Sequence, residues 1–146
     1  MPKKPRIRHE VRGLRIRGAR GHPDVRSAYI RFGRWLREHR DFPTLLPVYL
    51  LPGEQVLTLD GRRCAASFFA PFSRRDAPYI RVATGDYPEL RRARGRDNAL
   101  AAFLHSFAHE LLHYEQWVQG RSVSERGIKR RASELVRRYA LDVDRP

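Results

Sequence analysis

The sequence predicts a single α+β domain in which one helix is followed by a small, mostly antiparallel sheet and then by two further helices. Apolar residues recur at helical spacing over residues 23–39, and short apolar runs separated by turn residues fill residues 45–84. Helical spacing returns over residues 98–118 and again over residues 122–141. A chain of 146 residues is long enough for one core and leaves little room for a second.

The first helix is expected from Pro23 to about His39. Proline suits the first helical position, and Asp24 beside it stabilises the positive end of the helix dipole. One face of this helix is apolar, because its apolar side chains recur at steps of three and four residues. These side chains are Val25, Ala28, Tyr29, Phe32, Trp35 and Leu36.

Three or four strands are expected next. Leu45–Leu51 is a short apolar run, and residues 55–60 alternate well enough for a second strand. An Asp-Gly hairpin signal at positions 60 and 61 links that strand to residues 62–72. The last strand is expected over residues 78–84 (PYIRVAT), which begin with Pro78 and end with Thr84.

Two helices are expected in the last third of the chain. The first is long, begins at a cap formed by Asp97 or Asn98, and continues to about Val118. Its apolar positions are so numerous that the helix should be largely buried. The second is expected from about Ser122 to Leu141, with one apolar inner face.

The long helix contains the pattern HExxH, with His109, Glu110 and His113 at its fixed positions. Side chains at i and i+4 lie on one helical face about 6 Å apart, so both imidazoles can bind one ion. Zinc accepts neutral imidazole nitrogens and leaves a position for water, and Glu110 stands where it can accept the proton of that water. The alternative is a pair of half-buried histidines that act as ordinary hydrogen-bonding groups, but burying them beside a glutamate without a metal or partner would be costly.

The stretch AFLHSFAHELLHYEQWVQGRSVSERGIKRRASELVRRYA resembles the catalytic helix pair of small gluzincin-type zinc peptidases, including minimal gluzincins. It is more loosely similar to the zincin domains of the ImmA/IrrE and SprT-like groups. The resemblance covers about residues 99–140, and HExxH is its one specific motif. It implies one zincin-like catalytic domain over residues 21–146. It also implies that His109 and His113 bind zinc, that Glu110 is the general base, and that a glutamate on the next helix is the third ligand.

The same resemblance implies that an edge strand before the HExxH helix pairs with an extended peptide substrate. Residues 78–84 match that strand by their position in the chain. The sequence departs from the pattern at Lys129, where some gluzincins have an acidic residue that orients a ligand histidine.

Two glutamates compete as the third metal ligand. Glu125 lies three residues before Ile128 and seven before Ala132, so it continues the apolar inner stripe of the last helix. Glu134 lies among arginines at four-residue spacing, which suits an exposed face. In an antiparallel helical hairpin Glu125 would be level with the zinc, and Glu134 roughly 12 Å further along the axis. We therefore expect Glu125 to bind the metal; the alternative is a capping box with Ser122, in which its carboxylate turns back to the backbone.

The composition limits the possible cofactors and the expected location. Cys64 is the only cysteine, so an intramolecular disulfide and a thiolate metal cluster are both excluded. No apolar run of signal-peptide length follows the basic N-terminus. No run approaches the roughly 18–20 apolar residues of a membrane span, so a cytoplasmic protein without membrane contact is expected.

The net charge is +14, and lysine contributes to it only at Lys3, Lys4 and Lys129. A basic surface of this size would attract phosphate backbones, and residues 1–20 are expected to form a basic arm or a short edge strand. The alternative is a GC-rich genome that favours arginine codons without selection for binding. The arginines are spread over every segment and lack the aromatic interleaving of a single-strand platform, so we expect weak, non-specific nucleic-acid binding at most.

The HExxH site and Glu125 together predict a zinc-dependent metallopeptidase. Two alternatives remain open. One is a basic zincin that associates with nucleic acid and acts on DNA-bound proteins. The other is a zincin-like module that binds metal without catalysis.

Overall fold

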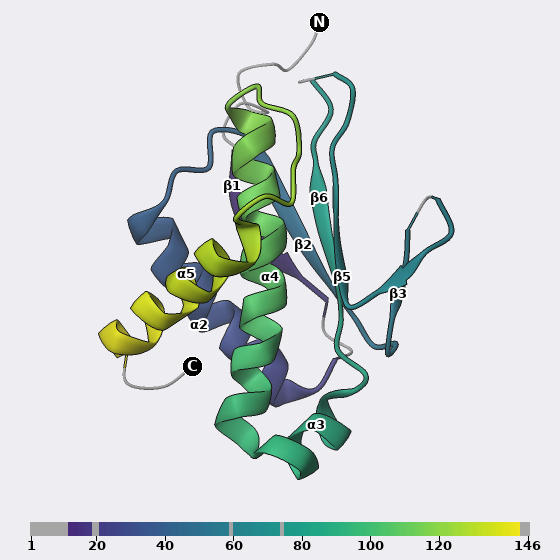
Figure 1. Cartoon of the computed structure of the whole chain (residues 1–146), viewed down its shortest axis with the longest axis vertical. Helices are drawn as coiled ribbons and strands as arrows, with labels where there is room; N and C mark the ends of the chain where they lie inside the picture. Colours follow the sequence, from purple (N-terminus) through teal and green to yellow (C-terminus); the bar gives the residue numbers. More distant parts are fainter. Residues whose placement is uncertain (1–11, 19–20, 59, 74, 144–146) are drawn as a thin grey trace, which may run out of the picture.

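A computed structural model of the chain describes residues 12–18, 21–58, 60–73 and 75–143, and it has the predicted α+β class (Figure 1). Of the predicted basic arm, residues 1–11, 19 and 20 lie outside the described residues. The elements in chain order are β1 (Gly13–Arg17), α2 (Pro23–His39), β2 (Leu45–Leu51), β3 (Val56–Leu57), β4 (Arg63–Cys64), β5 (Ala66–Phe69), β6 (Tyr79–Ala83), α3 (Tyr87–Arg94), α4 (Arg96–Val118) and α5 (Ile128–Val143).

The main sheet is mixed, with the strand order β1-β2-β6-β5. β1 pairs with β2 in parallel, β2 pairs with β6 in parallel, and only β5 and β6 are antiparallel. The prediction of a mostly antiparallel sheet is therefore wrong. The reason is that α2 connects β1 to β2 as a crossover, which returns the chain to the same end of the sheet and makes neighbouring strands parallel.

The edge strands of this sheet are β1 and β5, and not the strand that the sequence predicted. β6, which occupies most of the predicted run of residues 78–84, lies between β2 and β5. The Asp-Gly turn instead closes a separate two-stranded hairpin of β3 and β4, which leaves Ala66–Phe69 to pair with β6 from outside. The prediction that residues 78–84 offer a free edge is wrong, because both sides of β6 already pair with other strands.

The core lies between the sheet and two helices. α2 packs on β1, and α4 packs on β5, β6 and α2. The apolar face predicted for α2 is buried along its length, and the Tyr29 hydroxyl donates a 2.7 Å hydrogen bond to the backbone oxygen of Phe103 in α4. The side chains that the sheet contributes to this core include Leu14, Leu46, Val48, Ile80 and Val82.

The connection before α4 contains a helix that the sequence did not predict, α3. It is short and rich in arginine, and Tyr87 is its only buried side chain, so it carries no apolar stripe. α4 then begins at Arg96 after Gly95, whose φ of 84° interrupts the helical conformation. The expected cap by Asp97 or Asn98 is therefore wrong, because both residues lie inside the helix.

The segment between α4 and α5, residues 119–127, is called the α4–α5 loop below. Gly120 and Gly127 in this loop have φ values of 77° and 72°, a left-handed conformation that a continuing helix does not allow. α5 therefore begins at Ile128, six residues after the predicted start at Ser122. The prediction that the C-terminal helix carries Glu125 is wrong, because Glu125 lies in the α4–α5 loop.

In the described part of the chain, every helix falls short of the length and apolar character that crossing a membrane requires.

Candidate metal centre

His109 and His113 lie one turn apart on α4, and their rings face the same side of the helix with centroids 5.0 Å apart. The helix places them firmly because the apolar residues around them, Phe107, Ala108, Leu111 and Leu112, are buried in the core. The side chain of His113 is 4% exposed and that of His109 is 17% exposed. Both imidazoles therefore lie just below the protein surface, and the ring of His109 is the more exposed of the two.

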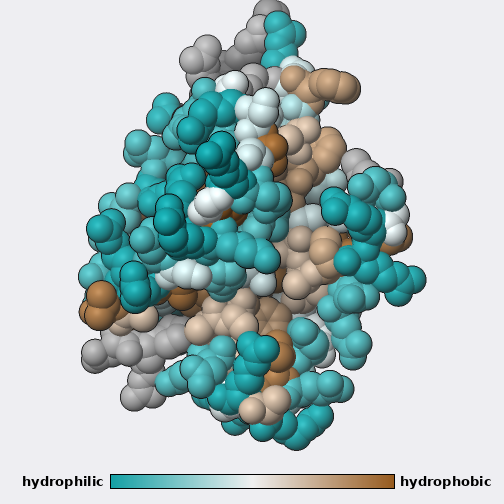
Figure 2. Space-filling model, viewed as in Figure 1, coloured by the Kyte–Doolittle hydropathy of each residue, from teal (hydrophilic) through white to brown (hydrophobic). Residues whose placement is uncertain are grey.

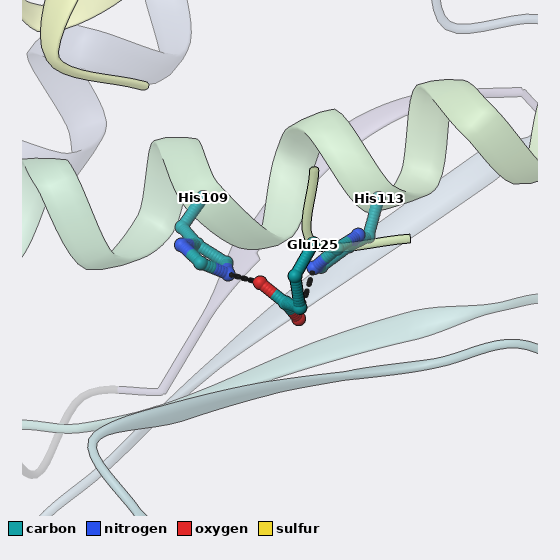
Figure 3. A group of neighbouring side chains, drawn as sticks. All are labelled: His109, His113 and Glu125. Atoms are coloured by element: carbon teal, nitrogen blue, oxygen red, sulfur yellow. Dashed lines mark hydrogen bonds and ion pairs between the residues drawn. The ribbon is translucent and has the colours of Figure 1, made fainter. Parts of the chain in front are cut away.

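The Glu125 carboxylate lies between these two rings (Figure 3). Its Oε1 atom is 2.8 Å from His109 Nε2, and its Oε2 atom is 2.9 Å from His113 Nε2. The three possible ligand atoms lie within 4.8 Å of one another. His109, His113 and Glu125 thus form a group that could hold a metal ion.

Glu134, the competing glutamate, lies away from the histidines. It is exposed on α5 and borders a separate hollow together with Arg40, Arg131 and Arg138. The capping-box alternative for Glu125 does not occur, because Ser122 is too far from the start of α5 and the carboxylate contacts both imidazoles. Of the two candidates, the structure brings Glu125 to the histidines and leaves Glu134 among arginines.

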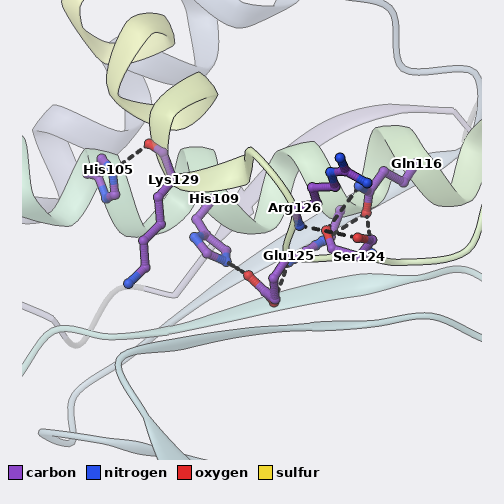
Figure 4. Close-up of polar contacts among 8 residues, drawn as sticks. His105, His109, Gln116, Ser124, Glu125, Arg126 and Lys129 are labelled. Carbon is purple, nitrogen blue, oxygen red and sulfur yellow. Dashed lines mark hydrogen bonds and ion pairs between the residues drawn. The ribbon is translucent and has the colours of Figure 1, made fainter.

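Gln116 is a residue of the site that the sequence did not single out (Figure 4). Its Oε1 atom accepts a 3.0 Å hydrogen bond from the backbone N–H of Ser124, and its Nε2 atom donates a 3.1 Å hydrogen bond to the Ser124 backbone oxygen. These two bonds fix which end of the amide is oxygen. The same Oε1 lies 3.0 Å from His113 Nδ1, so this ring nitrogen must be the donor.

The contact with Gln116 therefore determines the tautomer of His113. In the neutral form the hydrogen on Nδ1 leaves the lone pair on Nε2, the atom that would bind a metal, whereas the 2.9 Å contact of Nε2 with Glu125 Oε2 is a hydrogen bond only when Nε2 carries a hydrogen as well. Metal-bound histidines usually donate their other N–H to such an acceptor. Gln116, which is 6% exposed, is such an acceptor for His113.

The charge states of His109 and Glu125 also suit a metal ion. Burial lowers the pKa of His109, although the negative charge of Glu125 opposes this shift. Burial acts to raise the pKa of Glu125, but the charges and hydrogen bonds of His113 and His109 outweigh it and the pKa is lowered. A neutral imidazole and an ionised carboxylate are the forms that bind a metal.

Glu110 lies next to His109 in the sequence, and its carboxylate is directed toward β5. Burial and the nearby charge of Glu125 raise its pKa to about 8, against a hydrogen bond from the Phe68 backbone that lowers it. Glu110 therefore lies on the side of α4 that faces β5 and borders the groove between them.

A groove of about 500 Å³ passes between α4 and β5 and includes His113, Glu125 and Glu110. The β3–β4 hairpin forms its other wall with Arg62, Arg63 and Cys64. Figure 2 shows an apolar strip in this region, between the hydrophilic surface over the α4–α5 loop and that of the hairpin. Two of the three candidate ligands, His113 and Glu125, thus border this groove.

His105 and Tyr114, the other polar side chains near the motif, have structural roles. The Nε2 atom of His105 lies 3.1 Å from Ser133 Oγ, so His105 joins α4 to α5. The Tyr114 hydroxyl donates a 2.7 Å hydrogen bond to the Thr44 backbone oxygen in the core.

The donor set consists of two imidazole nitrogens and one carboxylate oxygen, on a helix and on a loop that Gln116 ties to that helix. Because Gln116 keeps the hydrogen of a neutral His113 on Nδ1, Nε2 can bind a metal ion in place of its contact with Glu125, and the residues present fit such an ion. Comparison of the chain with protein-family models, with curated proteins and with solved structures gave no match, so the geometry of this centre carries the functional assignment.

Proposed function

We propose that this protein is a zinc-dependent metallopeptidase, with His109, His113 and Glu125 as metal ligands and Glu110 as general base. The observation that carries the proposal is the convergence of two imidazole Nε2 atoms and one carboxylate within 4.8 Å, beside a half-buried glutamate and an open groove. Two histidines with one carboxylate, and a further position left for water, form a common catalytic zinc site. Calcium and magnesium prefer all-oxygen ligands, which this group does not supply.

Zinc bound by these side chains would lower the pKa of a coordinated water and polarise the scissile carbonyl. Glu110 then has the task of moving a proton. The positive charge of a bound zinc ion would favour the ionised form of Glu110 and so counter the burial that raises its pKa to about 8. The Glu110 carboxylate would then accept the proton of the attacking water and deliver it to the nitrogen of the leaving amine. The position of Glu110 in the same groove as His113, Glu125 and β5 supports this role.

The edge strand β5 is the proposed place for the substrate backbone. The Ala83 N–H donates to the Ala65 oxygen at 2.8 Å, and the register continues as Ser67 opposite Arg81 and Phe69 opposite Tyr79. In an antiparallel pair the residues between these, Ala66 and Phe68, direct their N–H and C=O groups away from the partner strand. The Phe68 N–H already meets the Glu110 carboxylate, so an extended peptide would hydrogen-bond as an added strand to the N–H and C=O of Ala66 and to the C=O of Phe68. The substrate site thus moves from the predicted residues 78–84 to Ala66–Phe69.

Metal analysis and digestion of an unfolded protein such as casein test the proposal together. The wild-type protein, purified without chelator, should contain about one zinc per chain and cleave casein. Glu110→Gln should keep the zinc and lose at least about 100-fold of the activity, because the amide has the same shape but cannot accept a proton. Glu134→Gln, an exposed glutamate on α5, is the matched control and should keep both properties.

The same preparations separate the alternatives. Equal cleavage by the wild type and Glu110→Gln would indicate a contaminating protease or another mechanism and would refute the proposed base. Bound zinc without cleavage of any unfolded substrate would make the protein a metal-binding module without peptidase activity. Absence of zinc together with no thermal stabilisation by added zinc would refute the metal assignment.

A further inference from the structure

The sheet has a second face, opposite α2 and α4. Successive side chains of a strand point to opposite faces, so the residues between the buried core positions lie on this second face. On β1 the core positions are Leu14 and Ile16, which leaves Arg15 and Arg17 on the opposite side. The same alternation puts Tyr49 there, beside the buried Val48 of β2.

The register aligns these side chains in two rows across the sheet. In the first row Arg17 is opposite Tyr49, Tyr49 is opposite Arg81, and Arg81 is opposite Ser67. Two residues earlier on β1, β2 and β6, the second row contains Arg15 opposite Pro47 and Tyr79 opposite Phe69. Tyr49, Tyr79, Phe69, Arg15, Arg17 and Arg81 are called the aromatic–arginine face below.

The three rings of this face form one continuous group on three neighbouring strands. Phe69 and Tyr79 are stacked with centroids 4.9 Å apart, and Tyr49 meets Tyr79 edge-on at 6.1 Å. Tyr49 is 39% exposed, although a large aromatic side chain with only a structural role would usually be buried. The rings therefore present apolar surface to solvent at the centre of the sheet.

The arginines flank the rings on two sides. Arg15 and Arg17 are exposed on the edge strand β1. The Arg81 guanidinium is held over the Tyr79 ring, with Cζ 5.9 Å from its centroid, by a 2.7 Å hydrogen bond from Nη2 to the Leu57 backbone oxygen. This arrangement places fixed positive charge beside exposed π surfaces, on a chain whose net charge is +14.

We infer that the aromatic–arginine face binds single-stranded nucleic acid without strong sequence preference. Bases stack on the rings, and phosphates pair with the arginines on either side. A duplex fits less well, because its bases are already paired and stacked and cannot reach the rings. The positive charge favours a polyanion over a neutral apolar partner. None of the six residues is a proposed metal ligand or base, but Phe69, Tyr79 and Arg81 also border the groove beside the metal centre. The tests below therefore change Tyr49, Arg15 and Arg17, which do not border it, so that their outcome does not depend on the peptidase assignment.

Fluorescence anisotropy with a labelled oligothymidylate of about twenty nucleotides tests the inference, with a duplex of equal length for comparison. The full-length wild type should bind the single strand more tightly than the duplex. Tyr49→Ala should weaken this binding about 5-fold or more, the loss expected for one stacked base. Tyr49→Phe keeps the ring and should bind within about twofold of wild type.

A charge-matched pair of double variants separates a localised site from general electrostatic attraction. Arg15→Ala/Arg17→Ala removes two charges from the face, and Arg130→Ala/Arg137→Ala removes two exposed charges from α5. The Arg15→Ala/Arg17→Ala variant should lose at least about fivefold more affinity for the single strand than the α5 variant, because only Arg15 and Arg17 flank the rings. Thermal unfolding of each variant checks that it is folded.

Three results would overturn the inference. The first is equal loss of affinity in the two double variants, which would indicate diffuse attraction. The second is wild-type affinity in Tyr49→Ala, and the third is duplex binding as tight as single-strand binding.

Discussion

Replacing Gln116 by methionine should weaken metal binding, although Gln116 is not a proposed ligand. The substitution keeps the length of the side chain and removes three hydrogen bonds, one with His113 Nδ1 and two with the backbone of Ser124. Without them His113 can place its hydrogen on Nε2, and the α4–α5 loop is released one residue before Glu125. Two of the three ligands would then need to be reoriented when the metal binds.

The expected magnitude follows from these contacts. Loss of a group that orients a metal ligand typically reduces metal affinity 10- to 100-fold, which corresponds to about 1.4–2.7 kcal/mol. Ser124 is exposed, so water can replace its two bonds to Gln116, and the loss of the acceptor for the buried His113 should dominate the effect. Gln116→Glu keeps an acceptor for His113 and for the Ser124 N–H, so it should retain most of the zinc affinity.

Competition for zinc with a chromophoric chelator measures these affinities directly. Gln119→Met is the matched control, because Gln119 is exposed at the C-cap of the same helix. A Gln116→Met protein that is folded and binds zinc within about threefold of wild type would show that the amide does not orient His113.

Three further perturbations address the ligands and the fold. Glu125→Ala should lose bound zinc while Glu134→Ala keeps it, and the opposite result in metal analysis would show that the wrong glutamate was chosen. His113→Ala should lose both zinc and the rise in melting temperature that added zinc gives the wild type, since metal binding adds to folding stability; an unchanged zinc-dependent rise would exclude His113 as a ligand. The hydrogen bond from the Tyr87 hydroxyl, at 2.7 Å, lowers the pKa of Asp24 below its ordinary value of 3.8 against the effect of burial. The ionised Asp24 therefore stabilises the fold at neutral pH, and this contribution is lost as the pH falls below 3.8. The difference in unfolding free energy between wild type and Asp24→Asn, measured by urea titration, should narrow below that pH. A difference that stays constant with pH would show that ionised Asp24 does not stabilise the fold.

The helices could be predicted from the sequence because their signals are local. The bounds of α2 agree with the prediction, since Pro23 and an apolar stripe at helical spacing define it. α3 was missed because an arginine-rich helix with one buried residue has no such stripe. The strand pairing was wrong for a different reason: whether β6 lies inside the sheet depends on β2, which is about thirty residues earlier in the chain.

The site shows the same division between local and distant information. HExxH spacing predicts the two imidazoles on one face of α4, and the structure places them there. Glu125 lies beside them although the reason given for it was incorrect, since it reaches them from a loop and not from a helical face. Gln116, three residues after His113 on the same helix, had a detectable signal in its spacing. The aromatic–arginine face had none, because its members are spread from residue 15 to residue 81 and meet only through the register.

The contact between Gln116 and Ser124 also determines how much chain entropy the metal must overcome. In polymer terms, binding of one ion by His113 and Glu125 closes a loop of 12 residues. The hydrogen bonds between Gln116 and Ser124 already close the inner 8 residues of that loop. Because closure entropy grows only with the logarithm of loop length, extending the closure from 8 to 12 residues costs about 0.4 kcal/mol. A bound ion would therefore meet a loop whose closure is largely complete, and closing the remainder would reduce its affinity only slightly.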